Sequence, residues 1–236
     1  MSTRIGVITD AHANLPATEA ALAALDAVGC DVVIHMGDAI GIGPHPREVM
    51  DLLLNQPAAV LLLGNHDELF AFDQLRTPPE WISAGELEHH QWTHAQLPNE
   101  WRERVAKWPL THEVTIGFRT IRLQHYAIND EGFGPISRDN LAHELDASFR
   151  PTTDIVFFGH HHLRADVQGL ARYINPGALG TNPCQGARYA VIDELNDGTV
   201  DVSLHSAPYD AKPVRQALLE RGVPEAAFIL ETFLKS

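Results

Sequence analysis

Short groups of Asp, Asn and His recur between residues 10 and 162, and each group directly follows an apolar run. In chain order they are Asp10-Ala11-His12, Gly37-Asp38, Gly64-Asn65-His66-Asp67, His125 and Gly159-His160-His161-His162. Carboxylates that are crowded among imidazoles are costly to bury unless cations neutralise them. Carboxylate, carboxamide and imidazole ligands together suit manganese, iron, nickel or zinc better than a thiolate site would. The pattern therefore predicts a site for divalent metal ions.

The apolar runs before these groups have the length of buried strands. We expect strands at residues 5–9, 32–36, 60–63, 121–124 and 155–158. In α/β sheets, functional groups collect where strands end at their carboxyl edge. Glycine precedes three of the groups, at Gly37, Gly64 and Gly159, which suits tight turns and a close approach of the backbone. The strand ends are therefore expected to converge on one point.

The rest of the sequence predicts a single α/β domain over residues 1–236. Helical patterns at 17–27 and 46–55 alternate with the first strands, which is typical of a layered α/β sheet. Residues 68–112 are polar, have a helical pattern and hold all four tryptophans, so we interpret them as an inserted helical cap. Further strands are expected at 171–175, 188–193 and 200–205, and terminal helices at 212–221 and 225–234.

Taken together, the motifs resemble those of the calcineurin-like metallophosphoesterases. The pattern of that family is D-x-H, then G-D, then G-N-H-D/E, a lone His and G-H-x-H, in this order. Residues 41–44 (GIGP) and 175–180 (NPGALG) are similar to loops of its small bacterial and archaeal phosphodiesterase-like branch. The resemblance implies a four-layer α-β-β-α sandwich that hydrolyses a phosphoric ester. It is weakest in residues 68–112 and after residue 205.

The resemblance also implies a role for each motif residue. Asp38 would bridge two divalent metal ions, the first also held by Asp10, His12 and His162 and the second by Asn65, His125 and His160. A hydroxide between the metals would attack the phosphorus. His66 would stabilise charge on the phosphoryl group or protonate the leaving oxygen. Asp67 would act at the catalytic site by orienting a neighbouring histidine or loop.

One position departs from the family pattern. Members of the branch have glycine after the lone histidine, whereas Tyr126 follows His125 here. We expect Tyr126 to reshape the pocket and to contact substrate, together with Asn65 and with His45 in the loop at 43–46. His112 is an alternative to His125 as the ligand, although it precedes a strand rather than following one.

The other histidines near these motifs are expected to have structural roles. His161 lies between two expected ligands, and in an extended segment its side chain would face the other way. His90 and His94 are four residues apart, a spacing that places both on one helical face. We interpret that face as solvated, because no carboxylate motif accompanies it.

The composition limits the class of partner. The chain of 236 residues has a formal net charge of -14, so it is expected to repel nucleic acid. A small phosphate ester would need bound cations at its binding site for the same reason. No apolar run has the length of a membrane span, the N-terminus lacks a signal-peptide layout, and only Cys30 and Cys184 are present, so a cytoplasmic protein is expected. A homodimer is the default expectation for assembly.

Three functions are compatible with the motifs. The first is hydrolysis of a small phosphomonoester or phosphodiester, with nucleotides among the candidates. The second is a nuclease of the same family, against which the acidic charge argues. The third is a non-enzymatic scaffold of the same fold, against which the retention of His66 and of every expected ligand argues. The sequence favours the small-ester hydrolase.

Overall fold

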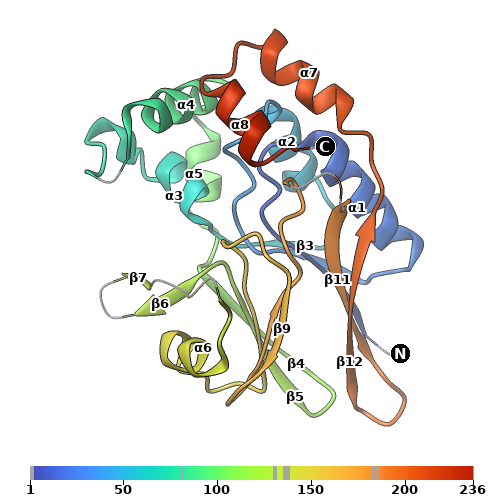
Figure 1. The fold of residues 1–236 in the computed structure, drawn as a ribbon. Coiled ribbons are helices and arrows are strands. Elements are labelled where there is room, and N and C mark those ends of the chain that lie inside the picture. The colour runs from blue at the N-terminus through green and yellow to red at the C-terminus, as the bar shows by residue number, and fades with distance from the viewer. Residues whose placement is uncertain are drawn as a thin grey trace.

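The computed structural model describes residues 3–80, 82–129, 132–134, 139–181, 184 and 186–235. Within these residues, the strands pair into two large sheets and one short hairpin. Helices flank the sheets on both sides (Figure 1). None of the described helices has both the length and the apolar character needed to cross a bilayer.

Sheet A contains the first three strands of the chain. Its order is β12-β11-β1-β2-β3, with β1 (Arg4–Ile8), β2 (Val32–His35), β3 (Ala59–Leu61), β11 (Ala187–Glu194) and β12 (Val200–Ala207). Strands β1, β2 and β3 run parallel, and β11 pairs with β1 in the antiparallel direction. The carboxyl ends of β1, β2 and β3 therefore lie at one edge of the sheet.

Sheet B contains the strands that precede the remaining ligand motifs. Its order is β4-β5-β8-β10-β9, with β4 (Thr111–Ile116), β5 (Arg119–Gln124), β8 (Ile155–Phe157), β9 (Ala165–Gln168) and β10 (Arg172–Asn175). Strand β8 is parallel to both β5 and β10. The hairpin of β6 (Ala127–Asn129) and β7 (Gly132–Gly134) follows β5. The carboxyl ends of β5 and β8 thus also point the same way.

The helices occupy the outer faces and one end of the sandwich. They are α1 (Leu15–Ala27), α2 (Pro46–Leu54), α3 (Asn65–Ala71), the 3-10 helix η1 (Gln74–Arg76), α4 (Ala84–Ala95), α5 (Trp101–Val105), α6 (Ala142–Phe149), α7 (Lys212–Glu220) and α8 (Ala226–Thr232). Helix α1 begins at Leu15, two residues before the expected helical pattern, because the Asn14 side chain accepts a hydrogen bond from the Ala17 N–H at 3.2 Å and Pro16 lies in the first turn.

Three apolar clusters hold the layers together. Leu25 of α1 packs with Ile8 on the outer face of sheet A. Val7 of sheet A and Phe157 of sheet B meet in the cluster between the sheets. Phe149 of α6 packs on the outer face of sheet B. The order helix, sheet, sheet, helix confirms the predicted four-layer sandwich (Figure 1).

The segment 68–112 is helical as expected, but its histidines are not on a solvated face. His90 and His94 are 5% and 8% exposed. The His94 ring packs against Phe70, with 5.3 Å between ring centroids, and the His90 ring lies 5.0 Å from that of His66. The prediction of a solvated face is therefore wrong, because this side of α4 packs onto α3. The interpretation of 68–112 as an inserted cap stays a prediction.

Burial makes His94 a source of acid sensitivity. Its Nε2 atom has no hydrogen-bond partner among the described residues. Burial, and then the charge of Arg102, lower the pKa of His94 to about 4 from its usual 6.5. His94 binds a proton more readily in the unfolded chain than in the folded protein. It therefore has little effect on the free energy of unfolding above pH 6.5 and lowers it as the pH falls from 6.5 towards 4.

We predict that protonation of His94 lowers the free energy of unfolding of the metal-free protein by about 2 kcal/mol when the pH is changed from 7 to 5. The variant His94→Gln should lose that part of the pH dependence, whereas His143→Gln, on the exposed side of α6, should keep it. Urea unfolding at the two pH values measures the difference. An unchanged pH dependence in His94→Gln would contradict the prediction.

Candidate metal centre

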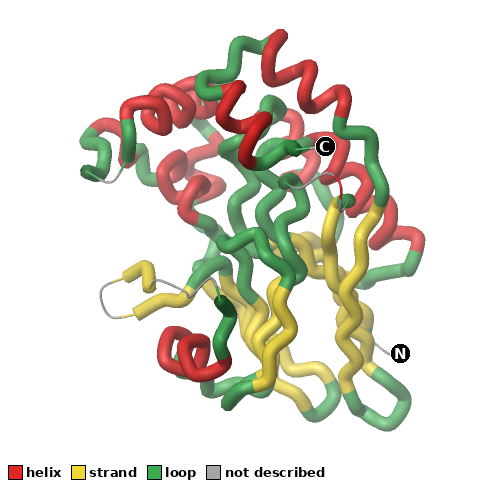
Figure 2. The backbone as a smooth tube through the Cα atoms, viewed as in Figure 1, coloured by secondary structure: helices red, strands yellow, loops and turns green. Residues whose placement is uncertain are grey.

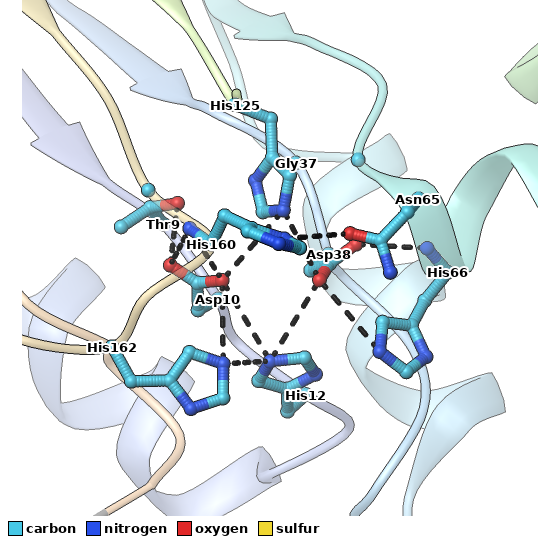
Figure 3. A network of polar contacts seen from close by, with 12 residues as sticks. Thr9, Asp10, His12, Gly37, Asp38, Asn65, His66, His125, His160 and His162 are labelled. Carbon is cyan, nitrogen blue, oxygen red and sulfur yellow. Dashed lines mark hydrogen bonds and ion pairs between the residues drawn. The ribbon is translucent and has the colours of Figure 1, made fainter. Parts of the chain in front are cut away.

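The strand ends bring all the predicted ligands to one place. Asp10 and His12 follow β1, Asp38 follows β2, Asn65 follows β3, His125 follows β5, and His160 and His162 follow β8. Loops gather at this end of the sheets, between the strands and the helices (Figure 2). The ligand side chains point toward a common centre (Figure 3).

The first group of ligands consists of Asp10, His12 and His162. The Asp10 Oδ1 atom lies 3.7 Å from His12 Nε2 and 3.6 Å from His162 Nε2. The two Nε2 atoms are 2.8 Å apart. His12 Nδ1 lies 3.2 Å from the carbonyl oxygen of Ile40, to which it donates, so the Nε2 lone pair faces the group. These three side chains could hold a metal ion.

The second group of ligands surrounds Asp38. Its Oδ2 atom lies 3.1 Å from His125 Nε2, while His125 Nδ1 donates to a main-chain carbonyl at 2.9 Å. His160 Nδ1 is 3.0 Å from Asn65 Oδ1. Asp38, His125 and His160 could hold a metal ion. Since Asp38 Oδ2 is also 3.9 Å from His12 Nε2, this carboxylate lies between the two groups.

Burial and charge set the protonation of these ligands. Asp10 and Asp38 are 0% and 1% exposed. Burial raises the pKa of Asp38, but the neighbouring histidines, His125 first, hold it well below its usual range. Burial lowers the pKa of His125, yet the charges of Asp38 and Asp10 outweigh it and raise that pKa to about 9. Burial also lowers the pKa of His12 well below its usual value, so this imidazole is neutral and its Nε2 lone pair is available to a metal ion.

The donor set fits divalent cations. Buried carboxylates and neutral imidazoles whose lone pairs converge are the ligands of borderline metals such as manganese, iron and zinc. The raised pKa of His125 shows how strongly the two carboxylates attract positive charge. The groups of described residues that could hold a metal ion include His125 and do not include its alternative, His112. His112 instead pairs with Leu123 in sheet B.

Five of the predicted ligands have left-handed backbones. The φ angles of Asp10, His12, Asp38, His160 and His162 are 54°, 45°, 57°, 69° and 61°. Residues other than glycine rarely adopt such angles, and strain of this kind concentrates at functional sites. One consequence concerns His161, which lines the cavity with its neighbours because the segment is not extended. The prediction that it faces away is therefore wrong.

Gly159 allows the two sheets to approach each other at the site. A Cβ atom on this residue would lie 2.2 Å from Thr9 Oγ1 and 2.9 Å from Asp10 Oδ2. The next residue, His160, donates its main-chain N–H to both Asp10 carboxylate oxygens at 3.2 Å. The close approach expected at Gly159 therefore allows a hydrogen bond between two predicted ligands, from His160 after a strand of sheet B to Asp10 after a strand of sheet A.

His66 and Asp67 follow the ligand Asn65 but face different ways. His66 lines the cavity, with its Nε2 atom 3.8 Å from Asp38 Oδ2. Asp67 is fully buried and accepts hydrogen bonds from the N–H groups of Asp38 at 2.8 Å and of Ala39 and Gly64 at 3.1 Å. Asp67 therefore holds the loop that carries Asp38.

Of the predicted substrate contacts, the structure brings only Asn65 to the cavity wall within the described residues. Tyr126 is 4% exposed and donates its hydroxyl hydrogen to Glu68 Oε2 at 2.6 Å. Its ring stands beside that of His125, with 5.4 Å between centroids. His45 is 8% exposed at the N-cap of α2. Neither of them is among the residues that line the cavity.

Sequence reasoning missed the part that α4 plays at the site. A cavity of about 880 Å³ opens over the ligands and is also lined by His89 and His90. His89 accepts a hydrogen bond from the Ile42 N–H at 2.8 Å, and its Nδ1 lies 3.2 Å from the Pro224 carbonyl, to which it donates. The only signal for this role was the run of histidines at 89–94, which the spacing alone did not connect to the ligands.

Comparisons with known proteins identify the family of the chain. Residues 3–197 match the calcineurin-like phosphoesterase superfamily domain. The chain is 24% identical to uncharacterized protein MJ0912 of Methanocaldococcus jannaschii, over 95% of this chain and 96% of that protein. It resembles the crystal structure of hypothetical protein PH1004 from Pyrococcus horikoshii, with a TM-score of 0.81, 22% identity and 97% of each chain covered. It also resembles that of a metallophosphoesterase from Sphaerobacter thermophilus, with a TM-score of 0.72, 25% identity and 96% of each chain covered. With its ligand motifs and two-sheet sandwich, the chain belongs to the calcineurin-like phosphoesterase superfamily.

Proposed function

We propose that this protein hydrolyses a small phosphomonoester or phosphodiester at two divalent cations. The observation that carries the proposal is the position of Asp38, a buried carboxylate between two groups of ligands at the base of a cavity. One cation would be held by Asp10, His12 and His162, the other by Asn65, His125 and His160, and Asp38 would contact both. The net charge of -14 argues against a nucleic acid substrate.

The reaction needs a nucleophile, charge neutralisation and a proton for the leaving group. When bound, the cations supply Lewis-acid charge for the phosphoryl oxygens and make water acidic enough to attack at neutral pH. Water adds to phosphorus, the bond to the ester oxygen breaks, and that oxygen takes up a proton. His66 is placed to hold this proton at Nε2, the ring nitrogen that faces Asp38 Oδ2 at the cavity surface.

Two hydrogen bonds position the residues that take part. The His66 main-chain N–H donates to Asp38 Oδ1 at 2.9 Å, which leaves Oδ2 directed to the ligands. The Asp67 carboxylate fixes the main chain of Asp38. His66 and the Asp38 carboxylate are therefore held relative to each other by the first turn of α3.

We predict that His66→Ala lowers kcat/KM by about 100-fold or more while metal content is unchanged, because it removes a general acid and no ligand. The protein would be stripped of metal, reloaded with manganese and assayed on phenyl phosphate and on diphenyl phosphate, because phenolate, unlike p-nitrophenolate, leaves poorly unless it is protonated. Metal content would be measured by mass spectrometry. The preferred ester distinguishes monoesterase from diesterase activity.

The matched control is His143→Ala, which removes an exposed histidine of α6 that does not line the cavity. It should retain the activity of the unsubstituted protein. Turnover of neither ester by protein with bound manganese would contradict the proposed hydrolase and favour a scaffold. Full activity of His66→Ala would contradict the proposed role of His66 but not the proposed hydrolase activity.

Gly41 offers a second test of the position of His66. A Cβ atom at Gly41 would lie 2.4 Å from His66 Nδ1, so Gly41→Ala must displace the ring or the loop. We predict that kcat falls at least about tenfold, since small misplacements of a catalytic group are costly. The matched control is Gly29→Ala, which has a similar left-handed φ, +73° against +83°, and no atom within 4 Å of its new Cβ. Equal activity of the two variants would contradict the prediction.

A further inference from the structure

The cavity over the ligands has two distinct halves. Its base is formed by ligand residues and by His66, whereas its walls are formed by α4 and α8. Helix α8 belongs to the C-terminal segment, far in sequence from every ligand motif, and lies near α4 at the helical end of the molecule (Figure 1). A substrate whose phosphate reached the ligands would place its organic group against these two helices.

Two aromatic rings line the α8 wall. The Phe233 ring packs edge-on against that of His162, with 5.9 Å between centroids. The Phe228 ring meets Phe233 edge-on at 6.1 Å and is 56% exposed. Leu163, 47% exposed, adds apolar surface beside them. A continuous apolar path thus leads outward from a predicted metal ligand.

The wall is firmly attached to the rest of the site. Ile229 of α8 is 3% exposed and packs with Ile42 and Val214 in one apolar cluster. Ile42 has a left-handed backbone, with φ of 63°, and His89 accepts a hydrogen bond from its N–H. Because α4, this loop and α8 are tied together, the aromatic rings have a defined position relative to the ligands.

The charge of the walls restricts what can bind there. The residues described as lining the cavity include Glu86 and Glu225 but neither lysine nor arginine. Any phosphate outside the reach of the predicted cations would therefore meet negative charge, with no lysine or arginine among the described lining residues to pair with it. A nucleoside diphosphate or triphosphate does not suit this cavity, whereas an uncharged apolar group does.

We infer that α4 and α8 form a pocket for an uncharged, apolar or aromatic organic group that is esterified to the phosphate of the substrate. The substrate class is then an ester of a single phosphate with an aryl or similar apolar substituent. The inference rests on the proposed function, since it assumes that the phosphate binds at the predicted cations. Phe228 is its main specificity-determining residue, as it is exposed in the cavity and contributes to no apolar cluster of the described core.

Two phosphonates test the pocket without turnover. Phenylphosphonate and methylphosphonate present the same anionic group and differ in the organic group alone. Calorimetric titration of manganese-loaded protein should show phenylphosphonate binding about tenfold more tightly. Phe228→Ala should weaken phenylphosphonate about threefold or more and leave methylphosphonate unchanged. The control Phe118→Ala removes a ring that is 83% exposed in the turn between β4 and β5, and should change neither affinity.

A third ligand tests the charge of the walls. Addition of a carboxylate in 4-phosphonobenzoate should weaken binding at least about threefold relative to phenylphosphonate, and Glu225→Gln should reduce that difference. Equal affinities for the phenyl and methyl compounds, or an unchanged preference in Phe228→Ala, would overturn the inference and leave the proposed hydrolase standing. Binding of neither phosphonate would contradict the proposed metal-dependent hydrolase and the pocket with it.

Discussion

The burial of Asp10 and Asp38 at one point is the constraint on which the structure depends. Both carboxylates are removed from water, and a bare pair of this kind is unstable without positive charge nearby. Main-chain N–H groups satisfy part of this demand, from His160 to Asp10 and from His66 to Asp38. Asp10 Oδ1 and Asp38 Oδ2 also face imidazole nitrogens, an arrangement that could hold cations.

The two-sheet architecture follows from that constraint. Parallel strands in each sheet end at the same edge, and the gap between the two edges is where the carboxylates and imidazoles meet (Figures 2 and 3). Close approach at Gly159 and the hydrogen bonds accepted by Asp67 fix the loops after the strands. Helices α4 and α8 then build outward from this base, and they give the cavity a surface that the sheets do not provide.

The sequence was informative where the determinants are local. An apolar run followed by glycine and then Asp, Asn or His predicts both a strand and a candidate ligand at its carboxyl end. The four-layer sandwich was implied by the resemblance of these motifs to those of a known family. The left-handed backbones of residues such as His160 could not be predicted, because glycine is the main residue type that indicates that conformation in a sequence. The alternation rule therefore failed at His161.

Features that depend on packing between segments far apart in the chain could not be predicted from the sequence either. His90 and His94 have the spacing of a surface pair, and only the packing of α4 onto α3 buries them. Tyr126 occupies a position where its family has glycine, but its hydroxyl turns away to Glu68. The aromatic wall comes from a helix near the C-terminus whose pattern carries no sign of the site.

The most direct test of two cations that share Asp38 is anomalous X-ray diffraction from crystals of the manganese-loaded protein. Two peaks are expected, one among Asp10, His12 and His162 and one among Asn65, His125 and His160, with the Asp38 carboxylate between them. A single peak at saturating manganese, or peaks remote from these residues, would contradict this arrangement.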